Sequence, residues 1–104
     1  MLVKLVEVIE VKRNYSQKAE NTGGSSYSLR EVTINPSHVV CLREDMRMTQ
    51  RLHEGRLPED IDQRQRFTRV YLARGQTGID LTVVGSLEQT QRILGVDGRE
   101  VLRG

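Results

Sequence analysis

The chain has little of what commonly reveals a function or a cellular compartment. Its 104 residues contain one cysteine, one phenylalanine, three tyrosines and no tryptophan. With Cys41 as the single cysteine, no disulfide can form within the chain, and this indicates a reducing compartment. The length is that of one domain, residues 1–104. Because large aromatic side chains are scarce, the core must be built from Val, Leu and Ile, which favours a β-rich fold.

Motifs for catalysis or metal binding are also missing. His38 and His53 are the only histidines, and no cysteine or carboxylate pattern with metal-ligand spacing accompanies them. The sequence has no phosphate-binding glycine loop, no nucleophile elbow and no paired catalytic carboxylates. Cys41 lies in the apolar run HVVCL, which favours a buried structural thiol over a nucleophile. We therefore expect no catalytic residue, metal or cofactor, and a small enzyme is kept only as a third hypothesis.

Long hydrophobic runs are absent too. The apolar N-terminal segment is interrupted by Lys4, Glu7 and Glu10, which excludes a signal-peptide core or a membrane span there and predicts a cytoplasmic protein. The formal charge of +2 does not by itself indicate a nucleic-acid binder. Arginine nevertheless outnumbers lysine thirteen to three, and the planar guanidinium group suits phosphate and bases. A GC-rich genome is the alternative explanation of this bias.

The hydrophobic pattern predicts five strands followed by one helix. The strands are expected at residues 2–13, 27–34, 38–44, 67–73 and 79–84, which form a strand-rich body over 2–84. The first segment has apolar residues on both faces, so it is a bulged strand or one covered by a partner, and a helix there stays possible. Ser86 and Gln89 have the spacing of a capping box, and Gly95 ends the predicted helix at 86–94 before a short tail, 95–104.

Two connections are long and polar. Residues 14–26 have the composition of a surface loop. Residues 45–66 are rich in Arg, Asp and Glu, and they form a long charged insertion between the third and fourth strands. Its first part predicts a short helix with Met46, Thr49, Gln50 and His53 on one side, ended by Gly55. We interpret the whole segment as a solvated insertion.

The stretch VYLARGQTGIDLTV, residues 70–83, is two apolar strands joined through Arg74-Gly75. This motif and the five-strand layout resemble the Sm and LSm proteins, and the chain is similar to what a phage or bacterial member would be. The resemblance implies a mainly β fold: a five-stranded Sm-like small barrel with a C-terminal helix and a long charged insertion. It also implies a homo-oligomeric ring, closed by the pairing of edge strands, that binds single-stranded RNA around its pore.

By that layout, the nucleotide-facing turns are 35–38 and 74–76. Asn35 and His38 are expected to hydrogen-bond to a base or stack on it, and Arg74 to contact phosphate or stack. Gly75 allows close backbone approach, and Gln76 completes the nucleotide-facing turn. The simpler interpretation of Arg74-Gly75 is a solvated hairpin turn. On the strength of the resemblance, the leading function is an oligomeric protein that binds single-stranded RNA or DNA in nucleic-acid processing or regulation. The alternative is a structural or adaptor protein that docks a protein partner through 45–66.

Overall fold

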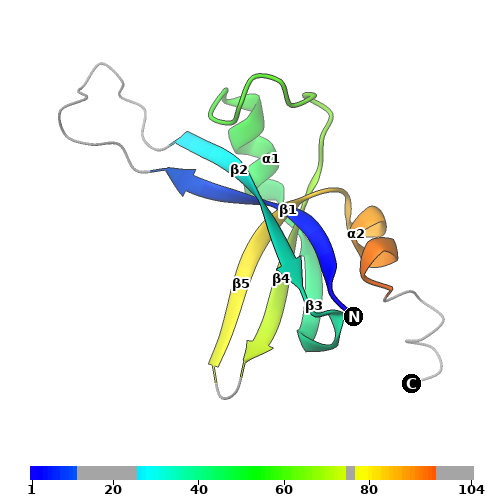
Figure 1. Ribbon diagram of the computed structural model, residues 1–104. Coiled ribbons are helices and arrows are strands. Elements are labelled where there is room, and N and C mark those ends of the chain that lie inside the picture. Colours follow the sequence, from blue (N-terminus) through cyan, green and yellow to red (C-terminus); the bar gives the residue numbers. More distant parts are fainter. Residues whose placement is uncertain (12–25, 75–76, 96–104) are drawn as a thin grey trace.

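The computed structural model describes residues 1–11, 26–74 and 77–95 (Figure 1). Their elements are five strands, two α-helices and one 3-10 turn. The strands are β1 (Val3–Val11), β2 (Ser26–Ile34), β3 (Val39–Glu44), β4 (Phe67–Arg74) and β5 (Thr77–Val84). The helices are α1 (Met46–His53) and α2 (Leu87–Leu94), and the 3-10 turn η3 (Pro36–His38) lies between β2 and β3. The mainly β fold with a C-terminal helix, predicted from the sequence, is confirmed.

The five strands form one antiparallel sheet in the order β2-β1-β5-β4-β3. The sheet is open, so the prediction of a closed barrel is wrong. The reason lies in the connection from β2 to β3. A tight hairpin would pair these two strands, but the turn η3 instead leads the chain to the opposite edge of the sheet, where β3 pairs with β4. β2 and β3 are consequently the two edge strands.

The first strand buries one apolar residue on each face against its own chain. Successive side chains of a strand point to opposite faces, and Leu5 and Val8 belong to different apolar clusters. The α2-side cluster consists of Leu5, Ile34, Val70, Val83 and Leu94. The α1-side cluster consists of Val8, Met48, Leu52, Leu57 and Phe67. The buried residues Leu5 and Val8 therefore need no partner subunit to explain them, whereas Val6 and Val11 are exposed. The helical alternative for this segment is wrong.

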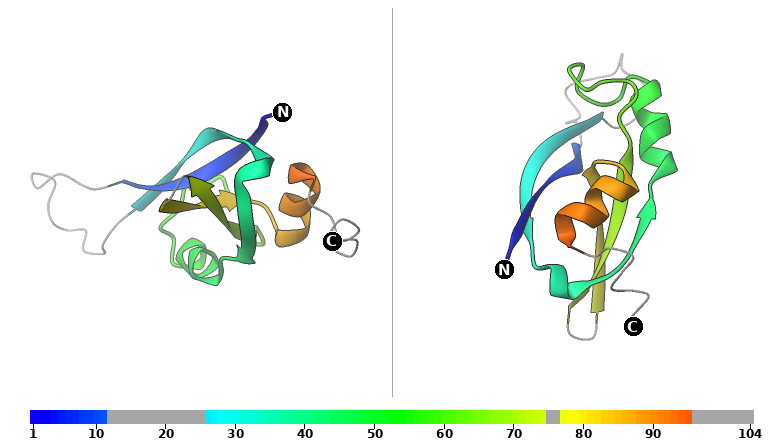
Figure 2. Two further views of the ribbon diagram at one scale, coloured as in Figure 1. Left: turned by 90° about the horizontal axis from the view of Figure 1, so that it is seen from below. Right: turned by 90° about the vertical axis from the view of Figure 1, so that its right-hand side faces the viewer.

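Residues 45–66 form part of this core. The helix α1 was predicted, but the buried side is made by Met48 and Leu52, while Met46 is 67% exposed. Leu57, in the loop that follows α1, is buried against the same cluster. The interpretation of the segment as wholly solvated is therefore wrong, because these apolar side chains cover the sheet face that bears Phe67. Figure 2 shows α1 and its loop packed beside the strands.

The second helix begins and ends as the sequence predicts. Ser86 accepts a hydrogen bond from the backbone N–H of Gln89, and the Gln89 side chain accepts one from the backbone N–H of Ser86. These bonds satisfy two donors that an α-helix leaves free at its N-terminus. Gly95 ends α2 with φ of 76°, a left-handed conformation that glycine adopts without strain. Leu94 then lies in the α2-side cluster.

Several predictions lie outside the described residues: the loop at 14–26 apart from Ser26, the tail at 96–104, and the residues Gly75 and Gln76. Within the described part of the chain, neither α-helix has the length and apolar character needed to cross a bilayer.

Candidate nucleic-acid interface

The turn at 35–38 is built by its own polar side chains. The carboxamide oxygen of Asn35 accepts hydrogen bonds from the backbone N–H of Ser37 at 3.0 Å and from the Ser37 hydroxyl at 2.8 Å. Asn35 thereby caps η3, and Pro36 supplies its first residue. The predicted base contact of Asn35 would compete with these bonds, whereas the side chain of His38 is exposed and open to a ligand.

The second predicted turn lies at the same end of the sheet. η3 leads into β3, whose Val39 pairs with Leu72 near the end of β4, and Arg74 is the last residue of β4. Figure 1 shows η3 beside the end of the β4–β5 hairpin. The structure thus brings the turn at 35–38 and the backbone of Arg74 to one end of the molecule. Gly75 and Gln76 lie outside the described residues, so their predicted role stays a prediction.

A different set of residues lines the sheet face that α1 covers only in part. In the register of the sheet, Arg43 is opposite Arg69, and Tyr71 lies between Cys41 and Asp80. Residues paired across antiparallel strands point to the same face. Tyr71 and the two arginines therefore share one surface of β3, β4 and β5, next to the start of α1.

This surface is hollowed into a cleft with a volume of about 420 Å³. Its lining residues are Arg43, Glu44, Asp45, Met46, Arg47, Arg69 and Tyr71. Arg43 and Arg47 are exposed, and neither takes part in an ion pair with any described residue. The phenol ring of Tyr71 is half-buried. The cleft thus combines unpaired cations with an aromatic side chain.

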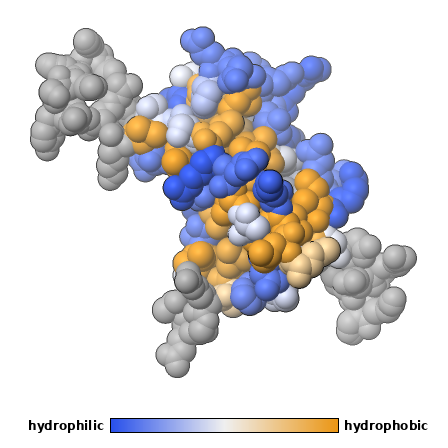
Figure 3. Space-filling view, in the orientation of Figure 1, coloured by the Kyte–Doolittle hydropathy of each residue, from blue (hydrophilic) through white to orange (hydrophobic). Residues whose placement is uncertain are grey.

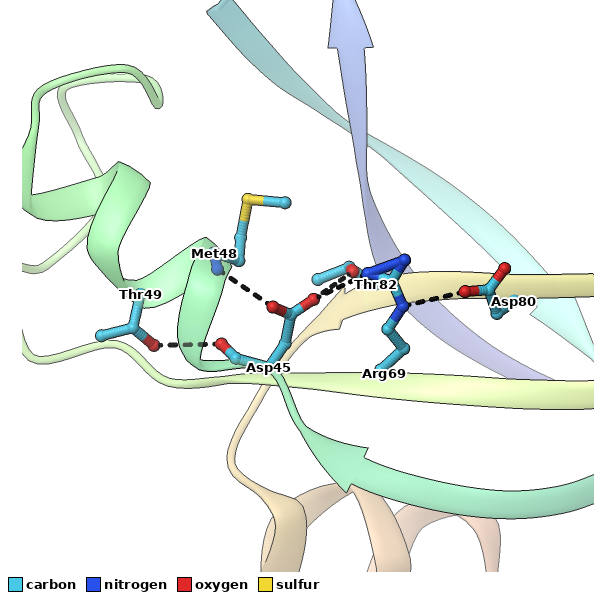
Figure 4. Close-up of polar contacts among 6 residues, drawn as sticks. All are labelled: Asp45, Met48, Thr49, Arg69, Asp80 and Thr82. Carbon is cyan, nitrogen blue, oxygen red and sulfur yellow. Dashed lines mark hydrogen bonds and ion pairs between the residues drawn. The ribbon is translucent and has the colours of Figure 1, made fainter.

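The floor of the cleft is a hydrogen-bond network around Asp45 (Figure 4). Asp45 caps α1 by accepting from the backbone N–H of Met48 at 3.0 Å. Its other carboxylate oxygen accepts from the Thr82 hydroxyl at 2.6 Å and from Nη1 of Arg69 at 3.3 Å. One buried carboxylate therefore connects the start of α1 to β4 and β5, and it fixes where the first turn of α1 meets the cleft.

These contacts decide the charge of Asp45. Burial by itself would raise the pKa of this carboxyl, but the bonds from Thr82 and Met48 and the positive charge of Arg69 outweigh burial and hold the pKa below its ordinary value. Arg69 also donates through Nε to Asp80 at 2.9 Å, and the pKa of Arg69 is raised, chiefly by that bond. At neutral pH, Asp45 and Arg69 are thus both charged.

A second cavity, of about 590 Å³, lies between the loop after α1 and the start of α2. It is lined by Asp62, Arg64, Gln65, Arg66, Ser86, Glu88, Gln89 and Arg92. Arg64 is paired with Asp62 and Arg66 with Glu44, and no aromatic side chain is present. The cavity is larger than the cleft, but its cations are mostly neutralised, so the cleft is the better candidate interface.

The sequence carried a signal for the cleft that a search for turn motifs misses. Arg69 and Tyr71 are two residues apart, and this spacing places both side chains on one face of a strand. The contribution of Arg43 and Arg47 depends on the pairing of β3 with β4 and on the direction of α1, neither of which a local pattern contains.

Comparison of the chain with protein-family models, with curated proteins and with solved structures gives no match. The resemblance to Sm and LSm proteins therefore stays a hypothesis, and the function is argued from the geometry of the cleft.

Proposed function

We propose that this protein binds single-stranded nucleic acid in the cleft of β3, β4 and α1. The observation that supports this function is the position of Tyr71 on an open sheet face, two residues along β4 from the cross-strand pair of Arg69 and Arg43. Arg43 and Arg47 form no ion pair with any described acidic residue. An aromatic ring with one accessible face accepts an unstacked base, and arginines beside it contact the neighbouring phosphates. A base paired within a duplex is not free to stack in this way.

The bound nucleic-acid strand would run from the cleft along β3 and β4 toward the other end of the sheet. His38 and Arg74 lie at that end, so the turns predicted from the sequence become the outer part of the same path. Binding through arginine and phosphate weakens as salt is added, because bound counterions are released. RNA is the first ligand to test, and a DNA oligomer of the same sequence is the second.

The test is fluorescence anisotropy of a labelled oligouridylate of about twelve nucleotides, within the range of sites found for single-strand binders. Stacking on an aromatic side chain contributes about 1–3 kcal/mol per base, so Tyr71→Ala should weaken binding about tenfold or more, and Tyr71→Phe should retain it. The double variant Arg43→Ala with Arg47→Ala should weaken binding and also flatten its dependence on salt.

The control is Arg30→Ala. Arg30 is also a surface arginine, but it pairs with Glu7 at 3.2 Å near the other edge of the sheet, away from the cleft. It should bind the oligomer nearly as the wild type does. Equal losses in Arg30→Ala and in the cleft variants would mean that only overall charge matters. No binding at low salt would reject the proposal and favour the adaptor hypothesis.

Homo-oligomerisation stays a prediction, and two features support it. The edge strands β2 and β3 each leave one side without a strand partner in the described residues, and unpaired edges favour pairing with another chain. Val40, in the irregular part of β3, is 65% exposed, and Figure 3 shows further apolar surface on the described part of the molecule. Light scattering coupled to size-exclusion chromatography should give a mass above that of one chain, and a monomer at every concentration would contradict it.

A further inference from the structure

Arg69 is the one arginine of the cleft that acidic side chains hold on two sides. Its Nη1 donates to the buried Asp45, and its Nε donates to Asp80. Its Nη2 makes no hydrogen bond with any described residue. The guanidinium edge formed by Nε and Nη2 is a fork that fits two oxygens of one phosphate. In the structure, Asp80 occupies this edge through a single bond.

We propose that Asp80 competes with phosphate for Arg69. The Nε–Nη2 edge of Arg69 is then unavailable to a phosphate until a bound nucleic acid displaces Asp80. This inference rests on the proposed function of the cleft. It would make Asp80 a residue that sets the affinity of the site, although it contacts no ligand itself.

The two acidic partners of Arg69 differ in how easily a ligand can replace them. The side chain of Asp45 is 5% exposed, and Thr82 and Met48 hold it from other directions. The side chain of Asp80 is 41% exposed and that of Arg69 is 38% exposed, and ion pairs so open to water contribute little. An arriving phosphate therefore displaces Asp80 from Nε, while Asp45 keeps Nη1 and holds the guanidinium group in the cleft.

The Asp80→Asn variant removes the competing charge and keeps the shape of the side chain. It should bind the labelled oligouridylate about fivefold more tightly at low salt, because phosphate no longer has to displace Asp80 from Arg69. The gain is no larger than this because an exposed ion pair contributes little. The slope of log affinity against log salt should stay nearly unchanged, because Arg69 contacts the same phosphate in both complexes and only the cost of displacing Asp80 differs. Asp80→Ala, which also removes the oxygen acceptor, should show the same gain if the asparagine variant does not fold.

Two comparisons separate release of Arg69 from a general charge effect. Asp62→Asn is the matched control, because it also frees an arginine, Arg64, from an exposed acidic partner, but in the other cavity. It should leave affinity nearly unchanged. In a double-mutant cycle, the gain from Asp80→Asn should disappear when Arg69 is replaced by glutamine.

The outcomes distinguish this inference from the proposed function. If the wild type binds, Tyr71→Ala weakens it and Asp80→Asn changes nothing, the competition is rejected and the cleft remains the binding site. A gain that persists with Arg69→Gln, or that Asp62→Asn reproduces, also rejects it. Failure of the wild type to bind at any salt concentration rejects both.

Discussion

Replacing Leu52 by alanine is expected to lower the free energy of unfolding by about 3 kcal/mol. Leu52 is 2% exposed and packs in the α1-side cluster with Phe67, which is fully buried. The substitution removes apolar surface from the cluster and leaves a cavity that the surrounding side chains can fill only in part. The measurement is urea denaturation followed by circular dichroism, with the midpoint and slope fitted separately.

Met46→Ala is the matched control on the same helix. Met46 is 67% exposed, so its truncation should change the free energy of unfolding by no more than about 0.5 kcal/mol. Similar small losses in both variants would mean that 45–66 is a solvated insertion after all. The expected difference between the two variants places one face of α1 in the core.

This prediction bears on the cleft as well. Arg47 lies in the first turn of α1. The position of that turn is fixed by the buried face of the helix, which packs on the sheet, and by the N-cap Asp45. Loss of Leu52 loosens the first of these supports. We therefore expect the Leu52→Ala protein to bind the oligonucleotide more weakly under conditions where circular dichroism shows it partly unfolded. Where circular dichroism shows it folded, we expect normal binding.

The strands could be predicted because their signals are local. The alternation of apolar and polar residues in 79–84 and the turn residues around Pro36 place the elements close to where the structure has them. The order of strands could not be predicted in this way, because the pairing of β1 with β5 joins residues far apart in sequence. The barrel was what the resemblance to Sm and LSm proteins implied, and the observed strand order leaves β2 and β3 unpaired with each other.

The same limit applies to the core and to the candidate site. Met48 and Leu52 are four residues apart, which is the spacing of one helix face. The many charged residues of 45–66 nevertheless favoured the interpretation that the whole segment is solvated. Asp45 precedes Met46 as an N-cap residue would. Its second partner, Thr82, is brought to it only by the sheet, and no local pattern contains that contact.

Asp45→Ala is expected to be the most damaging single change in the polar part of the molecule. It removes the cap of α1, which contributes about 1 kcal/mol, and it leaves the Thr82 hydroxyl buried without its acceptor, which costs about 1–3 kcal/mol more. We expect a total loss of about 3 kcal/mol in urea denaturation. Asp45→Asn keeps an oxygen for Met48 or Thr82 but not the charge beside Arg69, so it should lose less.

The dependence of this loss on pH follows from the direction in which the Asp45 pKa is shifted. The pKa is lowered in the folded protein, so the unfolded chain binds the proton first as pH falls. The stabilisation from the charged form is therefore complete above the ordinary pKa of aspartate and is lost as pH falls through the lower folded-state value. The difference in free energy of unfolding between wild type and Asp45→Ala should be constant near neutrality and shrink in acid. Asp62 also has a lowered pKa, caused by Arg64, but it is present in both proteins and cancels in the difference. A difference that grows with acidity would show that Asp45 is not held as the charged partner of Thr82, Met48 and Arg69.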